Sequence, residues 1–198
     1  MRFTQVRDIN VNTVLSVIEL LKTDYNIYFS YDDLKKLINS EHNLGRPDVA
    51  RLLMKNGYVH SVPEAFDKYL NNIRAKLGKR LKGLPYEECI DLILKSGGIP
   101  VLAHPKTLKL DDKELRELIK YMKSIGLSGI EVYHSIHSEE GRNNYLSIAN
   151  DYDLLISGGT DYHGPINKPF IKLGSGENNN IKIRKLTLVD ELNRKMQL

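Results

Sequence analysis

The chain has 198 residues, of which 41% are hydrophobic and 27% are charged, fractions typical of a soluble globular protein. This length fits one domain, or one domain with a small appendage, and it is shorter than the ~250 residues of a complete eightfold β/α barrel. The single cysteine, Cys89, excludes an internal disulfide and a cysteine-cluster zinc site. The formal net charge of +4 suits anionic substrates but is too small to indicate nucleic-acid binding by itself.

Targeting signals are not readable in the sequence. No apolar run approaches the ~18 residues that a membrane span needs. Residues 1–10 lack the apolar core of a secretory signal. Together with the single cysteine, these features favour a reducing, cytoplasmic setting.

Helices are predicted throughout the first half of the chain. Apolar residues at helical spacing indicate a helix over 11–24. Capping patterns predict three more helices: one begins after Ser30, one has Pro47 as its first residue and ends at Gly57, and one follows Ser61. No strand pattern is found in the first ~80 residues.

The second half alternates predicted helices with short apolar strands. The helices are expected at 85–98, 111–126 and 139–152, and the strands at 99–103, 129–133 and 153–157. This alternation indicates a parallel sheet with crossover helices, an α/β fold. Residues 174–180 are expected to form a loop, and 183–198 to hold a strand or a last helix. The chain therefore divides near residue 84 into a helical subdomain, 1–84, and a partial α/β domain, 85–198.

Candidate ligands follow each predicted strand. They are His104 after the first strand, Glu131, His134 and His137 within or after the second, and Asp161 and His163 after the third. Because parallel strands end at the same edge of a sheet, these side chains are expected to lie close together. Imidazole and carboxylate donors without thiolates suit Zn²⁺, Mn²⁺ or Fe²⁺.

Each of these residues also has a structural interpretation. Asp161 and His163 alternate in an extended segment, so they could bind one ion or two adjacent ions, or be a turn cap and a surface histidine. His104 precedes Pro105 and could simply end its strand. Glu131 lies inside an apolar strand, so it either faces a polar site or pairs with a base.

The remaining polar motifs leave two interpretations open as well. The spacing of His134 and His137 fits either one metal ion or an ordinary solvated loop. Arg46, beside the predicted start of a helix, could bind phosphate or be a surface arginine near a cap. The basic stretch 74–82 could attract phosphates or be a solvated helix end. Cys89 fits core packing better than nucleophilic catalysis.

Three motifs together resemble the PHP (polymerase and histidinol phosphatase) metal-dependent phosphoesterases: GGIPVLAHP at 97–105, GLSGIEVYHSIHS at 126–138 and LLISGGTDYHG at 154–164. The branch acting on nucleoside 3′,5′-bisphosphates and short oligonucleotides is the most similar, and residues 44–70 resemble its helical insertion. The resemblance covers nearly residues 1–173. It implies the C-terminal part of a distorted (β/α)7 barrel with an all-helical insertion.

The resemblance implies roles for individual residues. His104, Asp161 and His163 match metal ligands, whereas Arg46 and His137 match residues that contact substrate phosphate. Two departures stand out. A histidine is common in the family where this chain has Asp48, and the family's H-x-H motif is absent from the sequence.

A metal-dependent phosphoesterase acting on phosphomonoesters or phosphodiesters of nucleotide-like substrates is therefore expected. The missing H-x-H ligands imply that the site is incomplete without an N-terminal segment. A homodimer or a complementary N-terminal fragment is the expected partner for an incomplete sheet. The alternative is a noncatalytic remnant that binds phosphorylated ligands or a partner chain.

Overall fold

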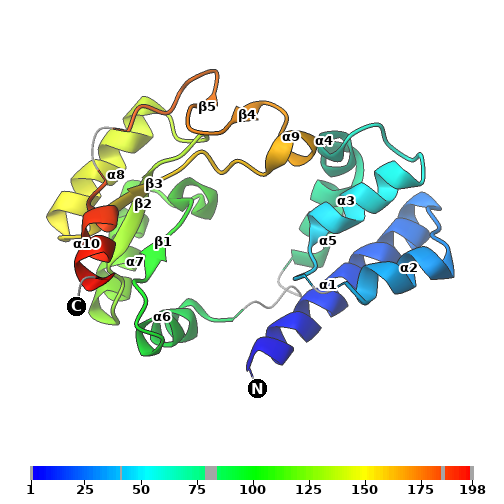
Figure 1. Cartoon of the computed structure of the whole chain (residues 1–198), viewed down its shortest axis with the longest axis horizontal. Coiled ribbons are helices and arrows are strands. Elements are labelled where there is room, and N and C mark those ends of the chain that lie inside the picture. The colour runs from blue at the N-terminus through cyan, green and yellow to red at the C-terminus, as the bar shows by residue number, and fades with distance from the viewer. Residues whose placement is uncertain (1, 41, 79–83, 184–185, 197–198) are drawn as a thin grey trace. The chain divides into compact units, whose positions relative to one another are not determined.

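A computed structural model describes residues 2–40, 42–78, 84–183 and 186–196. The chain forms two compact units (Figure 1). Unit 1 comprises residues 1–84 and 164–168, and unit 2 comprises residues 85–163 and 169–198. Among the described residues, no helix is long and apolar enough to cross a membrane.

The described part of unit 1 is helical. Its elements are α1 (Arg2–Tyr25), α2 (Tyr31–Ile38), α3 (Arg46–Lys55), α4 (Val62–Ala65), a π-helical segment (Phe66–Leu70), α5 (Asn71–Leu77) and α9 (Gly164–Asn167). The side chains of Val14, Val17 and Leu21 are completely buried in a core that they share with residues of α3 and α5.

The capping residues explain where two of these helices begin. The Ser30 hydroxyl accepts the Asp33 N–H at 3.1 Å, and the Ser61 hydroxyl accepts the Glu64 N–H at 3.2 Å. The expectation for Pro47 was wrong by one residue, because α3 begins at Arg46. An early proline is tolerated there since the first helical N–H groups have no partner within the helix.

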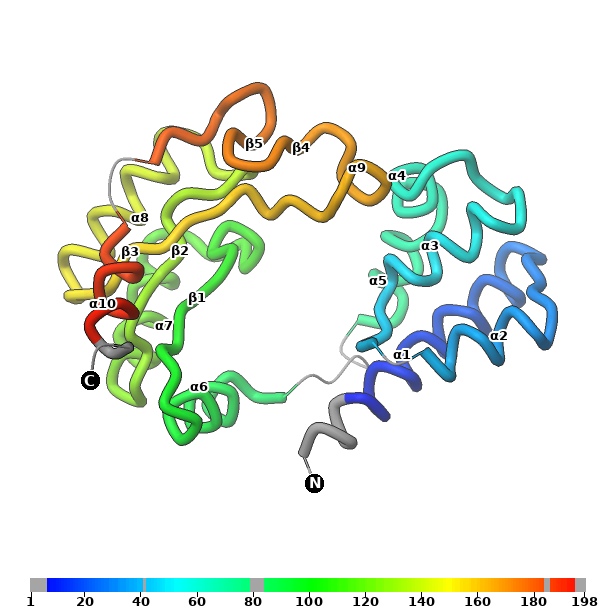
Figure 2. Tube along the Cα trace, viewed as in Figure 1, coloured from blue at the N-terminus to red at the C-terminus, as the bar shows by residue number. Residues whose placement is uncertain are grey.

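Unit 2 carries a small parallel sheet among helices, as Figure 2 also shows. Its elements are α6 (Tyr86–Lys95), β1 (Val101–Leu102), a 3₁₀ turn (Pro105–Leu108), α7 (Asp112–Ser124), β2 (Gly129–Tyr133), α8 (Glu139–Asp151), β3 (Leu155–Gly158), β4 (Ile171–Lys172), β5 (Gly176–Glu177) and α10 (Thr187–Met196). The predicted parallel sheet is confirmed, with strand order β1-β2-β3.

The central strand β2 organises the core of unit 2. Ile130 and Val132 are completely buried, and Tyr133 is nearly so. The pairing with β3 shifts register between Glu131 and Tyr133. Such an irregularity changes the direction of the side chains that follow it. This irregularity lies immediately before the turn that carries His134.

Candidate metal centre

Three strand ends deliver polar groups to one place in unit 2. His104 follows β1, His134 follows β2, and Asp161 follows β3. His104 and Asp161 both adopt left-handed backbone conformations, with φ of 49° and 55°. These conformations are uncommon for residues other than glycine and often mark functional sites.

His104, His134 and Asp161 form a compact ligand group. Each offers one ligand atom, and the three atoms lie within 4.8 Å of one another. The Asp161 carboxylate lies 3.9 Å from His104 Nε2 and 3.5 Å from His134 Nε2. His134 is buried, whereas the other two are partly accessible. This donor set and this spacing fit a divalent ion such as Zn²⁺, Mn²⁺ or Fe²⁺.

Glu131 supports the group from within β2. Its carboxylate accepts the backbone N–H of His104 at 2.7 Å and lies 3.7 Å from His104 Nε2. Burial raises the pKa of Glu131, and the neighbouring Asp161 adds to the increase despite the opposing effect of His104. Glu131 therefore faces the polar site and helps to orient His104, as carboxylates beside metal ligands commonly do.

The turn over 134–137 buries both of its histidines and exposes Ile136, so the interpretation of an ordinary solvated loop was wrong for the histidines. Both His134 and His137 are only 2% exposed. The His137 ring packs against Tyr145, with 4.8 Å between ring centroids. Burial lowers the pKa of His137, which favours the neutral imidazole.

His137 has a defined tautomer. Its Nδ1 lies 2.8 Å from the Val132 carbonyl, which can only accept a hydrogen bond. Nδ1 therefore carries the proton, and the neutral ring has a lone pair on Nε2. Within the described structure, Nε2 is buried and has no hydrogen-bond partner.

Side chains from distant segments hold the backbone of this turn. Its carbonyl groups accept hydrogen bonds as follows: Ser135 from Asn180 Nδ2 at 2.6 Å, Ile136 from Lys106 Nζ at 2.8 Å, and His137 from Arg142 at 3.2 Å. The Ser135 hydroxyl also donates to the Thr160 carbonyl at 2.6 Å, next to Asp161. These contacts fix the His134 backbone relative to Asp161.

His163 lies beside Asp161 but outside the compact group. Its Nδ1 is 2.7 Å from the Asp161 carbonyl oxygen and 3.5 Å from the carboxylate. Sequence reasoning selected His163 and left His134 open, whereas the described structure groups His134 with His104 and Asp161. The spacing of His134 and His137 was the signal that pointed to this histidine.

Arg46 is the first residue of α3, in unit 1. Its guanidinium carbon lies 5.3 Å from the centre of the Phe66 ring, the first residue of the π-helical segment. One terminal nitrogen is buried without a hydrogen-bond partner within the described structure. Burial lowers the pKa of Arg46, and the nearby Arg74 charge adds to this effect.

Asp48 has a structural role in unit 1. Its carboxylate accepts the Gly45 N–H at 2.8 Å, contacts His42 Nε2 at 2.8 Å and pairs with Arg51 at 2.6 Å. Burial would raise the pKa of Asp48, but these contacts hold it below its usual value. Asp48 thereby caps the N-terminus of α3 beside Arg46.

In the basic stretch 74–82, residues 79–82 lie outside the described residues.

Curated relatives of this chain are nucleases and phosphatases. The 5′-3′ exoribonuclease Rnm of Escherichia coli is 34% identical over 130 residues, which cover 65% of this chain and 43% of that protein. The 3′,5′-nucleoside bisphosphate phosphatase of Chromobacterium violaceum is 26% identical over 135 residues, covering 68% and 47%. The chain thus spans about half the length of these relatives. No family model matches it.

Solved structures with the same fold cover nearly the whole chain. A protein of Bifidobacterium adolescentis, described as a proposed metal-dependent phosphoesterase, has a TM-score of 0.71 and 27% identity, covering 97% of this chain and 65% of that one. An amidohydrolase of Chromobacterium violaceum, at 21% identity, shares the fold with a TM-score of 0.70, covering 97% and 65%. The resemblance to the PHP metal-dependent phosphoesterases is confirmed by these homologues.

Proposed function

We propose that this chain provides part of the active site of a metal-dependent phosphoesterase that hydrolyses nucleotide-like substrates. The meeting of His104, His134 and Asp161 at three strand ends is the observation that carries this proposal. Relatives that act on nucleoside bisphosphates and on RNA support a nucleotide substrate class. The ester is a phosphomonoester or a phosphodiester.

The residues of unit 2 would hold and orient the ion. A bound divalent ion supplies Lewis-acid chemistry for phosphoryl transfer. His104 and His134 would bind it as neutral imidazoles, and Asp161 as a carboxylate. Glu131 keeps His104 in place through its backbone N–H. We propose His163 as a further ligand, because its contact with the Asp161 carbonyl places it next to the group.

We propose Arg46 and His137 as phosphate contacts. The partnerless nitrogen of Arg46 and its place in the first turn of α3 suit an anion. His137 could donate from Nε2 only after it takes up a proton, because Nδ1 already donates to Val132. A neighbouring phosphate dianion would favour that proton.

We also propose that further metal ligands come from outside this set of residues. The sequence has no H-x-H motif, and three side chains leave coordination positions open on most divalent ions. An N-terminal segment of a longer chain, a separate fragment or a second copy of this chain would supply them. Phosphate release by the chain alone, at the rate of a complete enzyme, would contradict this part of the proposal.

The test is hydrolysis by the Mn²⁺-loaded chain of a nucleoside 3′,5′-bisphosphate and of a short oligoribonucleotide. Asp161→Asn is expected to reduce any metal-dependent phosphate release by at least about a hundredfold, because an anionic ligand is lost. Asp190→Asn, on the exposed face of α10, is the matched control and should keep full activity. Equal activity in wild type and Asp161→Asn would overturn the assignment.

A further inference from the structure

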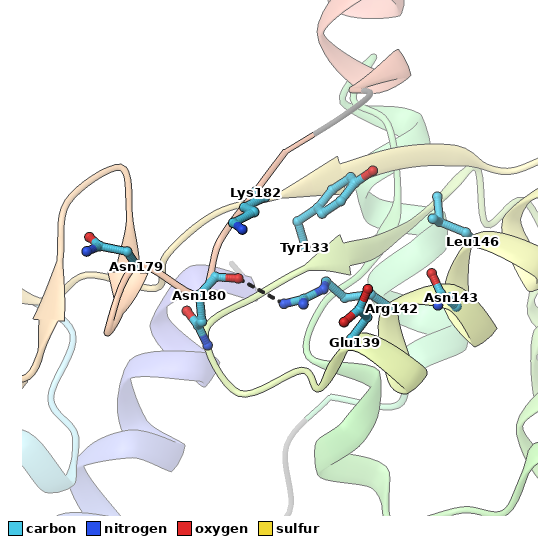
Figure 3. A pocket seen from close by; sticks show the side chains of 8 residues that line it. All are labelled: Tyr133, Glu139, Arg142, Asn143, Leu146, Asn179, Asn180 and Lys182. Atoms are coloured by element: carbon cyan, nitrogen blue, oxygen red, sulfur yellow. Dashed lines mark hydrogen bonds between the residues drawn. The ribbon is translucent and has the colours of Figure 1, made fainter.

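A pocket separate from the ligand group is present in unit 2. It has a volume of about 280 Å³ and is lined by Tyr133, Glu139, Arg142, Asn143, Leu146, Asn179, Asn180 and Lys182 (Figure 3). Its walls come from the end of β2, the first turns of α8 and the segment after β5. None of its residues belongs to the metal group.

Arg142 is held in place at this pocket. One of its terminal nitrogens donates to the carbonyl groups of His137 at 3.2 Å and Asn180 at 3.0 Å. Figure 3 shows the guanidinium pointing toward Asn180. Because a guanidinium has five N–H donors, this arrangement leaves further donors for a ligand.

Further donors line the same space. Lys182 is exposed and forms no ion pair with any described residue. Asn143 and Asn179 add side-chain amides, and Glu139 contributes the only carboxylate among the described residues of the lining. The side chains that line the pocket therefore carry a net positive charge. Tyr133 and Leu146 give the pocket an apolar side.

We propose that this pocket binds the phosphate group of a phosphorylated small molecule, separately from the metal centre. Arg142 and Lys182 supply the charge that a phosphate requires, and a fixed guanidinium suits its geometry. The remainder of the ligand lies along Tyr133 and Leu146. Since Arg142 also holds the His137 carbonyl, the ligand would contact a side chain that positions the turn carrying His134. The inference does not depend on catalysis.

The test is calorimetric titration of the full chain, in the presence of a chelator, with inorganic phosphate, AMP and adenosine. The chelator removes any contribution of metal-bound phosphate, so failure of the proposed hydrolase activity would leave this result unaffected. Saturable binding of AMP and phosphate is expected, with adenosine much weaker. Absence of saturable phosphate and AMP binding, or equal affinity for AMP and adenosine, would overturn the proposal.

Three variants locate the binding. Lys182→Met should weaken AMP binding on the order of tenfold, through loss of one charge-assisted contact. Glu139→Gln should strengthen it, since a like charge is removed. Lys172→Met, an exposed lysine of β4 outside the pocket, is the matched control and should bind as wild type does. Unchanged affinity in Lys182→Met would show that the phosphate binds elsewhere.

Discussion

His104 and Asp161 occupy left-handed conformations after the two outer strands of the parallel sheet, β1 and β3. A non-glycine residue in this region costs about 1 kcal/mol or more, and such a cost is typically retained where function requires it. Both side chains lie close to His134: the His104 ring centre is 4.7 Å from the His134 ring centre, and the Asp161 carboxylate is 3.5 Å from His134 Nε2. Two of the seven non-glycine residues with positive φ among the described residues thus belong to the ligand group.

His137 makes the stability of the chain depend on pH. Its pKa is lowered in the folded state, so below the usual value of 6.5 the unfolded chain binds more protons. The free energy of unfolding should therefore fall as the pH drops through and below about 6.5. Urea unfolding across this range should give a shallower dependence for His137→Gln than for wild type. An identical dependence would contradict the assigned neutral state.

Arg46→Ala should weaken the binding of a nucleoside 3′,5′-bisphosphate on the order of tenfold or more, because a charge-assisted contact is lost. The change should leave the fold intact, since the Arg46 side chain contacts the face of Phe66 rather than filling the core. Equilibrium binding measures the effect, and circular dichroism monitors the fold. Arg194→Ala, on α10, is the control. Unaltered affinity in Arg46→Ala would remove Arg46 from the phosphate site.

For individual residues, the sequence predicted which candidate ligands follow a strand better than it predicted their burial and contacts. His104 and Asp161 were found from their place after apolar strands. The role of His134 stayed open because its burial depends on contacts from distant segments, such as Asn180 to Ser135 and Lys106 to Ile136. No local pattern encodes such contacts.

Among the elements, β2 was predicted with the bounds that the structure shows, Gly129–Tyr133. Its β-branched and aromatic residues between glycine and a polar turn explain this agreement. Residues 174–180 were expected to form a loop, whereas β5 lies within them and pairs with β4, because two-residue strands show no periodicity in the sequence. The π-helical turn at Phe66–Leu70 interrupts a helix that was expected to be continuous.

The glycine pair at the end of β3, Gly158 and Gly159, gives a matched comparison. A Cβ at Gly158 would lie 2.5 Å from the Tyr133 Cβ and 2.9 Å from its carbonyl oxygen, whereas a Cβ at Gly159 would have no neighbour within 4 Å. Gly158→Ala should therefore lower the free energy of unfolding by about 1–3 kcal/mol. Gly159→Ala should change it little. Chemical denaturation measures both, and equal effects would refute the close packing of β2 on β3.

At the scale of the whole molecule, the described residues form two hydrophobic cores, one in each unit. The ligand group and the phosphate-pocket residues belong to unit 2, whereas Arg46 belongs to unit 1. We therefore expect the metal affinity of unit 2 to be unaffected by a substitution in the core of unit 1. The barrel implied by the family resemblance remains a prediction, since the described sheet has three parallel strands.

Leu53→Ala tests this independence. Leu53 is completely buried in the core of unit 1, so its truncation should cost about 2–5 kcal/mol of that unit's stability. Metal affinity, measured by calorimetry at a temperature where the variant is folded, should stay within about twofold of wild type. A loss of metal binding in folded Leu53→Ala would mean that the two units are coupled.

The most direct test of the account is the metal content of the purified chain after loading with Mn²⁺ or Zn²⁺ and desalting. Mass spectrometry should detect at least one ion per chain in the wild type and a large loss in both Asp161→Asn and His134→Gln. His60→Gln, in unit 1, should retain the wild-type content. A wild type that retains no ion, or variants that retain as much as the wild type, would contradict the metal centre.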